Sequence, residues 1–395
     1  MRTVGLIMEC NPFHKGHQHI LTCARELADG GPLIVILSGD FTQRGIPAIC
    51  SKEERTKEIL LAGADLVLEL PVVYATASAE TFANGAIGLL SSCGIVTDLV
   101  FGSESGDLHD LLHGAYFLAH EPDDFRLLLK QYLSSGENFP TARAKAAKNC
   151  SQHVDLPRFS NDLLGEEYLK ALIRNQLLGS TKEEGKIVPH AVPRMQTDSA
   201  SYLRSARKEN DDGIFEDDFS PLLLEALLMI SRNKTGTTFS DYMDISSDLA
   251  QRMETKLPQF VSWTQFCHLL KTKNLTYTAV SRALSHILLD IRKNDRMSFP
   301  VTYSRVLGIR RSHLFLLRQL KEQGFHPIIC KEDADNLLSR NEPEYLLLSH
   351  DLEASQLYDL VSRMKQSHSS KQNKEETEHG SAPLHEFRKK LFVLD

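Results

Sequence analysis

A short run near the N-terminus, Asn-Pro-Phe-His-Lys-Gly-His at residues 11–17, combines residue types that bind phosphate. An apolar strand is expected before it and a helix after it, so unpaired backbone N–H groups and the positive end of the helix dipole would meet there. Gly16 would let a phosphate approach the backbone. His14 and His17 can point to the same side of the first turn and donate hydrogen bonds to an α-phosphate. We predict an ATP phosphate site here, to which Lys15 adds positive charge.

The same two histidines allow other interpretations. A His-x-x-His pair can bind a metal, but the sequence shows no third ligand at a convincing spacing. Both side chains could also lie on the surface without a role. The prediction is therefore a phosphate site, with no protein-bound metal assigned to it.

The first third of the chain alternates between apolar strands and helices. This alternation is typical of a parallel sheet with helices on both faces, and ligands of such sheets bind beyond the carboxyl ends of the strands. We predict an α/β fold with a Rossmann-like parallel sheet. The predicted strands are Val4–Met8, Leu33–Leu37, Asp65–Pro71 and Asp98–Gly102, and the predicted helices are His17–Ala28, Ser51–Ala62 with a capping box of Ser51 and Glu54, Ser78–Ser92, Leu108–Ser134 and Asn161–Leu178.

The second half of the chain is predicted to be mainly α-helical, with a small α/β element at residues 305–329. An acidic run at residues 211–218 marks the predicted domain boundary. From about residue 367 to 382 the chain is polar and poor in hydrophobic residues, as in disordered segments. The predicted units are a catalytic domain at 1–210, a mainly helical domain at 211–365 and a flexible polar tail at 366–395.

Composition narrows the classes of protein. Of the 395 residues, 42% are hydrophobic and 25% are charged, as in soluble globular proteins of two or three domains. No stretch approaches the roughly 20 apolar residues of a membrane span, and nothing resembles a signal peptide. The seven cysteines are scattered, without metal or disulfide spacing. We predict a cytoplasmic protein without a membrane partner, and the sequence leaves its oligomeric state open.

Positive charge is concentrated in one segment, although the net charge is −7. Between Lys271 and Lys321 there are eleven basic residues and only two acidic ones. Such a segment on an acidic protein is typical of a polyanion-binding surface, although solvated helix faces would give the same count.

Longer runs of sequence resemble one family. The His-x-Gly-His residues 14–17 resemble the motif of nucleotidyltransferases and class I synthetases. The wider pattern is similar to that of bacterial tRNA(Met) cytidine acetate ligases, over most of the first 205 residues. This resemblance is carried by residues 5–17, 38–45, 63–71, 78–80, 101–104 and 164–172, with a looser match at 277–291.

The resemblance implies an enzyme that forms acetyladenylate from acetate and ATP, with Mg²⁺, and acetylates the wobble cytidine of elongator tRNA(Met). Gln43 and Arg44 lie on the loop after the second predicted strand, near the expected reaction centre of His14, His17 and Lys15, and we predict that they orient acetate or tRNA. A surface turn stabilised by Gly45 is the alternative interpretation of this loop. The implied ATP site comprises Ile7, Met8, Glu9, Cys10, Asn11, Pro12, Phe13, His14, Lys15, Gly16, His17, Gln18, His19, Ile20, Gly102, Asn161, Arg194, Ser199 and Ser201.

A tRNA substrate would need a second platform, which the basic segment could supply. Tyr277 and Tyr303 could stack on unpaired bases, because recognition of single-stranded RNA uses aromatic side chains together with cations. The candidate cations for tRNA are Lys271, Lys273, Arg282, Arg305, Arg310 and Arg311.

The sequence departs from the family pattern at four places. Asp40 and Asp162 each stand where asparagine is expected, the segment around residues 179–185 is longer than is typical, and the Gly-rich stretch expected after Arg194 is missing. Two other functions therefore stay open: an adenylyltransferase acting on a small-molecule acceptor, and a nucleotide- or RNA-binding protein without turnover.

Overall fold

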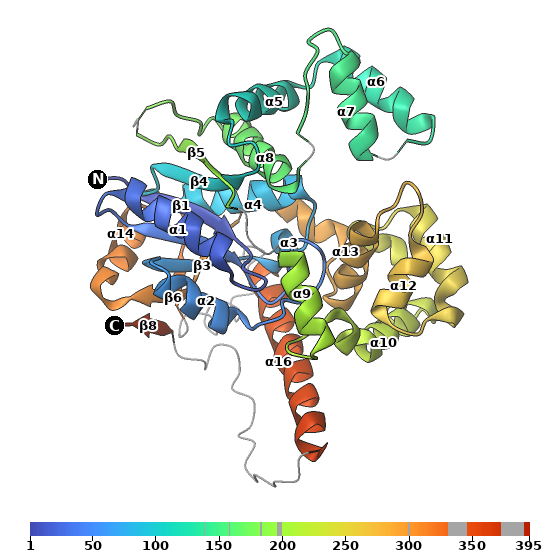
Figure 1. Ribbon diagram of the computed structural model, residues 1–395. Coiled ribbons are helices and arrows are strands. Elements are labelled where there is room, and N and C mark those ends of the chain that lie inside the picture. Colours follow the sequence, from blue (N-terminus) through green and yellow to red (C-terminus); the bar gives the residue numbers. More distant parts are fainter. Residues whose placement is uncertain are drawn as a thin grey trace.

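A computed structural model describes residues 1–137, 139–157, 159–181, 184–195, 200–298, 301–330, 346–372 and 391–395. The chain is built on an eight-stranded sheet with the order β5-β4-β1-β2-β3-β6-β7, and β8 pairs with β6 (Figure 1). The strands are β1 (Val4–Met8), β2 (Leu33–Ser38), β3 (Leu66–Leu70), β4 (Asp98–Ser103), β5 (Val188–Pro193), β6 (Ser304–Arg310), β7 (Ile328–Ile329) and β8 (Phe392–Leu394).

The first five strands are parallel to one another, as the sequence predicts. The chain runs from β1 outward to β2 and β3, then returns to place β4 and β5 on the other side of β1. The strand order therefore reverses beside β1, and a crevice forms at such a switch point, outside the carboxyl ends of β1 and β4.

Helices cover both faces of the sheet, as alternate side chains of β2 show. Leu33, Val35 and Leu37 pack in a cluster with α1 and α2, whereas Ile34 and Ile36 belong to the large core shared with α4 and α8. This alternation follows from the pleat of a strand buried on both faces. The helices of this part are α1 (Lys15–Ala28), α2 (Lys52–Leu61), α3 (Val72–Ala75), α4 (Ala79–Ser92), α5 (Leu108–His120), α6 (Asp123–Ser134), α7 (Phe139–Asn149), α8 (Ser160–Arg174) and α9 (Ala200–Glu209).

The helix predicted over Leu108–Ser134 is two helices, so that prediction is wrong. α5 ends with Glu121 in a left-handed conformation, and Pro122 is the N-cap of α6. Proline has no N–H to continue the hydrogen-bond ladder, which explains the break. α6 and α7 pack on each other around Phe125 and stand apart from the sheet in Figure 1.

The second half of the chain forms the predicted helical region, packed around Trp263, whose indole N–H donates to Ser281 Oγ at 3.1 Å. The predicted small α/β element is not a separate body. Its strand β6 pairs antiparallel with β3 and extends the first sheet. The helices of this half are α10 (Ser220–Ser231), α11 (Ser247–Lys256), α12 (Trp263–Leu270), α13 (Tyr277–Leu288), α14 (Phe315–Gln323) and α16 (Leu346–Gln372).

The C-terminal segment is only partly as predicted. Residues 366–372 belong to α16, and β8 at the end of the chain pairs with β6. Both elements fall within the predicted flexible tail, and residues 373–390 of that tail lie outside the described residues.

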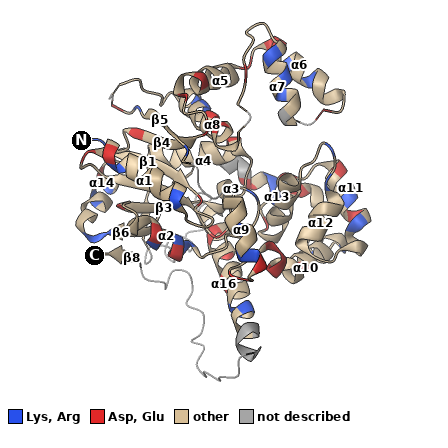
Figure 2. Cartoon of the chain, viewed as in Figure 1, with Lys and Arg blue, Asp and Glu red and all other residues tan. Residues whose placement is uncertain are grey.

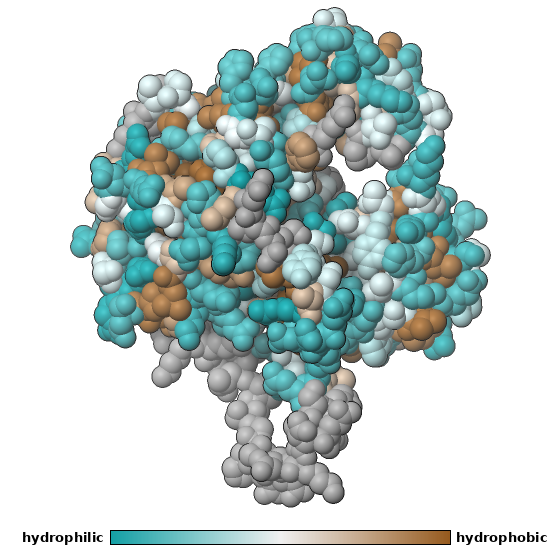
Figure 3. All heavy atoms as spheres, viewed as in Figure 1, coloured by the Kyte–Doolittle hydropathy of each residue, from teal (hydrophilic) through white to brown (hydrophobic). Residues whose placement is uncertain are grey.

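The surface carries hydrophobic side chains mostly scattered among hydrophilic ones (Figure 3). Among the described helices, none combines the length and the apolar character needed to cross a membrane.

Candidate nucleotide-binding site

A cavity of about 440 Å³ lies where the strand order reverses, beside the carboxyl ends of β1 and β4. It collects residues that are far apart in the sequence, from β1, α1, the loop after β2, β4, α8, the end of β5 and α9. The predicted site residues that line it are Ile7, Met8, Glu9, Cys10, Asn11, His14, Gly16, His17, His19, Ile20, Arg44, Gly102, Asn161, Arg194 and Ser201.

The two histidines form the cap of α1. His14 is the N-cap residue, and its Nδ1 accepts a hydrogen bond from the backbone N–H of Gly16 at 3.0 Å. His17 Nδ1 in turn accepts from the backbone N–H of His14 at 3.3 Å. Capping boxes are usually built from Ser or Thr with Glu. In α1 the two imidazole rings of His14 and His17 form the capping box. Their hydrogen bonds to the backbone at the helix end therefore fix their orientation.

This arrangement determines where the protons lie. A neutral imidazole whose Nδ1 accepts a hydrogen bond carries its proton on Nε2. Burial, together with the neighbouring His14 and Arg194, lowers the pKa of His17 to about 3, and burial also lowers the pKa of His14. Both rings are therefore neutral at pH 7, with Nε2–H as a donor available to a ligand.

Three arginines, Arg44, Arg194 and Arg204, line the cavity together with a single carboxylate, Glu9, among the described residues. Arg204 Nη1 donates to the carbonyl oxygen of Asn11 at 2.9 Å, which ties α9 to the loop before α1. The excess of guanidinium groups at a helix N-terminus makes this cavity suitable for a polyphosphate.

Glu9 is an unusual residue for a phosphate pocket, because its charge would repel the ligand. Its Oε1 accepts a hydrogen bond from the backbone N–H of Gln43 at 2.6 Å. Burial raises the pKa of Glu9, although Arg44 and Arg204 oppose the shift. Glu9 therefore holds the loop after β2 against the cavity and has an increased tendency to carry a proton.

Gly102 and Asn161 form the far wall. A Cβ atom built on Gly102 would meet only Ile20 Cδ1, at 3.6 Å, so the space above this residue is open. Asn161 lies in the first turn of α8, whose N-cap residue is Phe159. Its Nδ2 donates to Glu104 Oε1 at 3.0 Å, and the same oxygen pairs with Arg194 at 3.5 Å.

Some predicted ATP-site residues lie outside the cavity lining. Lys15 and Gln18 are exposed on α1, and Phe13 packs against the core instead. Pro12 is buried beside the cavity. The Gln43 side chain donates to Ala77 O at 3.3 Å, so it is held away from a ligand. Ser199 lies outside the described residues.

Arg55 is a residue that the sequence did not single out. It is fully buried, and its guanidinium donates to the carbonyl oxygens of Glu9, Ser38, Gly39 and Cys50. The first three carbonyls lie at or just after the ends of β1 and β2, and that of Cys50 lies just before α2. The buried guanidinium of Arg55 thus holds two loops in place. The one sequence signal for this role is an arginine on the side of the predicted helix that faces the sheet.

Two of the residues that depart from the family pattern, Asp162 and Asp40, have hydrogen-bond partners in the structure. Asp162 accepts from the backbone N–H groups of Glu104 and Ser105, at 2.9 and 3.1 Å, and so holds the turn after β4. Asp40 accepts from the backbone N–H of Lys52 at 3.2 Å and from Ser355 Oγ at 2.9 Å. Both carboxylates are therefore used in building the site's supports.

The candidate cations for tRNA do not form one patch. Figures 1 and 2 place α12 and α13 on one side of the molecule and α14 on the other. Lys271 and Lys273 are exposed beyond α12, whereas Arg311 is exposed near the C-terminus, where it pairs with Asp395 at 2.5 Å. The basic residues that are neighbours in the sequence are separated in space, because α13 and β6 lead the chain from one side of the molecule to the other.

Other members of that set have structural partners. Arg305 is buried and pairs with Glu69 at 2.9 Å, so it does not lie on the exposed surface that a tRNA contact would use. Arg310 donates to Ala64 O at 2.8 Å, and Arg282 pairs with Asp244 at 3.3 Å. Tyr303 is fully buried and cannot stack on a base, whereas Tyr277 is only half-buried.

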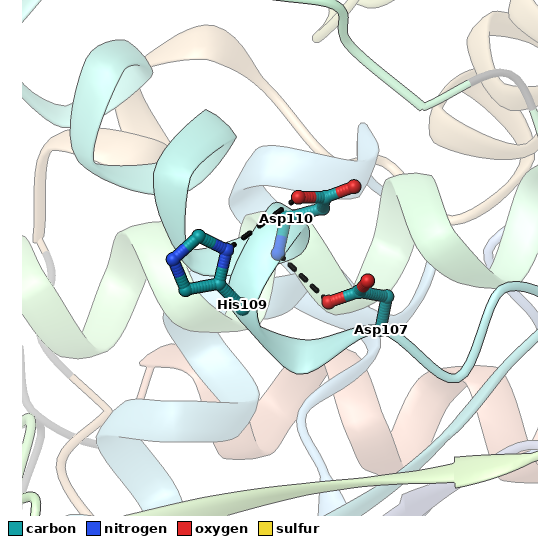
Figure 4. Close-up of side chains that lie close together, drawn as sticks. All are labelled: Asp107, His109 and Asp110. Atoms are coloured by element: carbon teal, nitrogen blue, oxygen red, sulfur yellow. Dashed lines mark hydrogen bonds and ion pairs between the residues drawn. The ribbon is translucent and has the colours of Figure 1, made fainter.

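One group of side chains among the described residues could share a metal ion, but it lies away from the cavity lining. Asp107, His109 and Asp110 are all exposed at the start of α5 (Figure 4). Asp107 is the N-cap of this helix and accepts from the backbone N–H of Asp110 at 3.1 Å. Helix capping explains the cluster.

Known proteins share this architecture and sequence. The HIGH Nucleotidyl Transferase family matches residues 1–196 and 171–374. A tRNA(Met) cytidine acetate ligase of Fervidobacterium nodosum is 35% identical over 364 residues, which cover 83% of this chain and 84% of that protein. One from Acetivibrio thermocellus is 32% identical over 379 residues, covering 84% and 88%.

A solved structure agrees with these relatives. Thermotoga maritima TmcAL bound with alpha-thio ATP has a TM-score of 0.81 and 27% sequence identity to this chain, covering 91% of this chain and 95% of that one. The chain therefore belongs to the tRNA(Met) cytidine acetate ligase family, within the HIGH nucleotidyl transferases.

Proposed function

We propose that this protein is an ATP-dependent ligase that activates acetate and acetylates the wobble cytidine of elongator tRNA(Met), forming N4-acetylcytidine. The observation that carries the proposal is the capping pair His14 and His17, whose Nε2–H donors adjoin a cavity with three arginines. Such preorganised donors stabilise charge that develops on a phosphoryl group. The names of the relatives supply the acceptor and the acetate.

The first step forms acetyladenylate. An oxygen of acetate attacks the α-phosphorus of ATP, and the bond to the bridging oxygen breaks, so that pyrophosphate leaves with the electron pair. Acetate is a weak nucleophile, and the rate must come from alignment and from stabilising the pentavalent transition state. His14 and His17 would donate to the α-phosphate oxygens, while Arg194 and Arg204 would hold the pyrophosphate.

ATP would lie across the switch point, with its sugar and base towards β4. The open space above Gly102 supports this orientation, because a ribose or adenine can lie against bare backbone there. Asn161, held by Glu104, is placed to meet a ribose hydroxyl or a base edge.

Mg²⁺ remains a prediction. The described residues of the cavity lining offer only the carboxylate of Glu9, which is bonded to Gln43 N and faces Arg44 and Arg204. Sites that bind Mg²⁺ with protein ligands usually provide one or two free carboxylates. These residues do not make such a site, so we assign Mg²⁺ no protein ligand.

The proposal is tested in two separate assays. With acetate, the protein should exchange labelled pyrophosphate into ATP without any tRNA. With labelled acetate, ATP and total tRNA, the label should appear in N4-acetylcytidine after digestion to nucleosides. Label in another nucleoside, or a product that retains AMP, would exclude the proposed activity and favour a different acceptor. RNA binding without exchange would favour a non-catalytic binding protein.

A further inference from the structure

A second, smaller cavity of about 200 Å³ adjoins the nucleotide cavity. The two share three lining residues, Arg44, Ser201 and Arg204, so they lie on either side of one common wall. The second cavity continues from this wall towards the helical region, where it is lined by residues of the loop before α10 and by the start of α13. It therefore lies between the nucleotide cavity and the helical region.

An aromatic ring forms one wall of this cavity. Tyr277 is the first residue of α13 and is half-buried. Its ring contacts His268 of α12, with 5.1 Å between the ring centroids, and this contact supports the ring from the helical region. An aromatic ring fixed in position in this way is a suitable platform for an unstacked base.

Cations surround the same cavity. Arg44, Arg204 and Lys208 line it, and Glu216 is the acidic residue among its lining residues. Lys208 Nζ pairs with Glu216 Oε1 at 2.7 Å, which leaves the two arginines on the shared wall as the excess positive charge. An aromatic platform beside arginines is the combination by which proteins bind single-stranded nucleic acid.

The size of the cavity restricts its ligand. Pockets for drug-sized molecules are typically about 300–1,000 Å³, and the nucleotide cavity falls within this range, whereas the second cavity is smaller. It suits one flat ring with its backbone left outside. A base extruded from an RNA loop has this shape.

We propose that this second cavity receives the acceptor cytosine of the RNA, stacked on Tyr277, with Arg44 and Arg204 beside its phosphates. The inference rests on the proposed function and adds the place of the acceptor. The edge of a base in this cavity would face the side that the two cavities share, and so would face the acetyladenylate in the nucleotide cavity.

Glu9 lies on the nucleotide side of this wall and is a candidate proton acceptor. It lines the nucleotide cavity and is close enough to Arg44 and Arg204, the shared residues, for both to act on its charge. In the transfer, the cytosine N4 forms a bond to the acetyl carbon, and the bond from that carbon to the AMP oxygen breaks with its electrons going to AMP. The proton lost by N4 passes to the carboxylate of Glu9.

The test separates the two half-reactions. Tyr277→Ala removes the platform, Tyr277→Phe retains the ring, and Tyr116→Ala on α5 is a matched control, since Tyr116 is 47% exposed and outside both cavities. In Tyr277→Ala we expect acetate-dependent pyrophosphate exchange to be unchanged, while kcat/KM for tRNA acetylation falls by about 10- to 100-fold. Tyr277→Phe and Tyr116→Ala should acetylate tRNA within about two-fold of wild type.

A second measurement locates the base directly. An anticodon stem–loop with 5-bromocytidine at the wobble position should photocrosslink to the peptide that contains Tyr277, and excess unmodified stem–loop should prevent it. Crosslinks elsewhere only, or a Tyr277→Ala variant that acetylates tRNA as well as wild type, would overturn the proposal. So would an equal loss of exchange and transfer in that variant. Failure of the wild type to exchange pyrophosphate would instead contradict the proposed function itself.

Discussion

The imidazole rings of His14 and His17 stack on each other, with their centroids 3.9 Å apart and their planes inclined by 24°. Two protonated rings at this separation would repel strongly in a partly buried site. The stack and the two Nδ1 hydrogen bonds therefore favour the same state, in which both rings are neutral and both Nε2–H groups are donors. The phosphate binding that we propose for this pair would then depend on directed hydrogen bonds more than on charge.

Replacing either histidine should stop adenylation without unfolding the protein. Asparagine at position 14 can still cap α1, because its side-chain oxygen accepts from the helix N–H groups. We expect His14→Asn and His17→Ala to lower the pyrophosphate exchange rate by about 10²–10³-fold, as loss of one transition-state donor typically does. His109→Ala, exposed on α5, is the control. Exchange at the wild-type rate in both variants would remove the pair from catalysis.

The open space at Gly102 predicts a steric block. Leucine there should fill the cavity next to Ile20 with little strain in the fold, since a Cβ finds only one contact at 3.6 Å. We expect Gly102→Leu to raise the KM for ATP by more than about 10-fold, with a melting temperature near that of wild type. Gly88→Ala on α4, where a Cβ meets nothing within 4 Å, should leave the KM unchanged. An unchanged KM in Gly102→Leu would place ATP elsewhere.

Acidification should act on the protein through His17. Burial lowers the pKa of His17 to about 3, whereas a histidine in the unfolded chain titrates near pH 6.5. Its contribution to stability is full above pH 6.5 and is lost as the pH falls towards 3, because only the unfolded chain takes up the proton. NMR of the free protein should show the His17 ring shifts unchanged from pH 8 to 5. A midpoint near 6.5 for His17 would contradict this.

Asp351 should give the opposite dependence on pH. It anchors α16: its Oδ1 accepts from Val72 N at 2.6 Å, and the Tyr303 hydroxyl donates to its Oδ2. Burial, together with the charge of Glu69, raises the pKa of Asp351. The stability it contributes is full below about pH 4, where an unfolded aspartate also binds its proton, and is lost as the pH rises through the native pKa.

Urea unfolding at pH 5 and 8 measures this effect. Asp351→Asn keeps the two hydrogen-bonding positions and removes the titration. We expect wild type to lose more than about 1 kcal/mol of unfolding free energy over this range relative to Asp351→Asn. Parallel changes in the two proteins would show that Asp351 is ionised throughout.

Glu9 should be needed for transfer and not for activation. Glu9→Gln retains an oxygen for the Gln43 N–H, so the loop after β2 should keep its place. Loss of a general base typically costs about 10²–10⁴-fold. We expect such a loss in tRNA acetylation, measured under single turnover, with exchange within a few-fold of wild type. The wild-type transfer rate should rise with pH through the raised pKa of Glu9, and this rise should be absent in the variant.

Much of the local structure could be predicted because it depends on near neighbours. The Ser51 and Glu54 capping box begins α2 as expected, since both partners lie within one turn. The runs that form β1 to β4 are apolar almost throughout, so both of their faces must be buried. Their place in a parallel sheet follows from this pattern. The loop at residues 11–17 is of the same kind, because a strand, a short loop and a helix suffice to define it.

Contacts between distant segments could not be predicted in this way. Nothing beside Arg305 in the sequence shows that β6 would pair with β3 and bury that arginine against Glu69. Similarly, the junction of the two cavities requires Arg44 and Arg204, which are far apart in the sequence, to lie on one wall.

The sequence alone therefore determined the kind of fold, the loop between β1 and α1 and the family, because these depend on periodicity and on residues adjacent in the chain. Only the tertiary structure decided which charges face a ligand and which are paired in the core. The type of a charged residue in the sequence does not indicate whether its side chain is solvated or buried. Its environment depends on the burial and the partners that the rest of the fold provides.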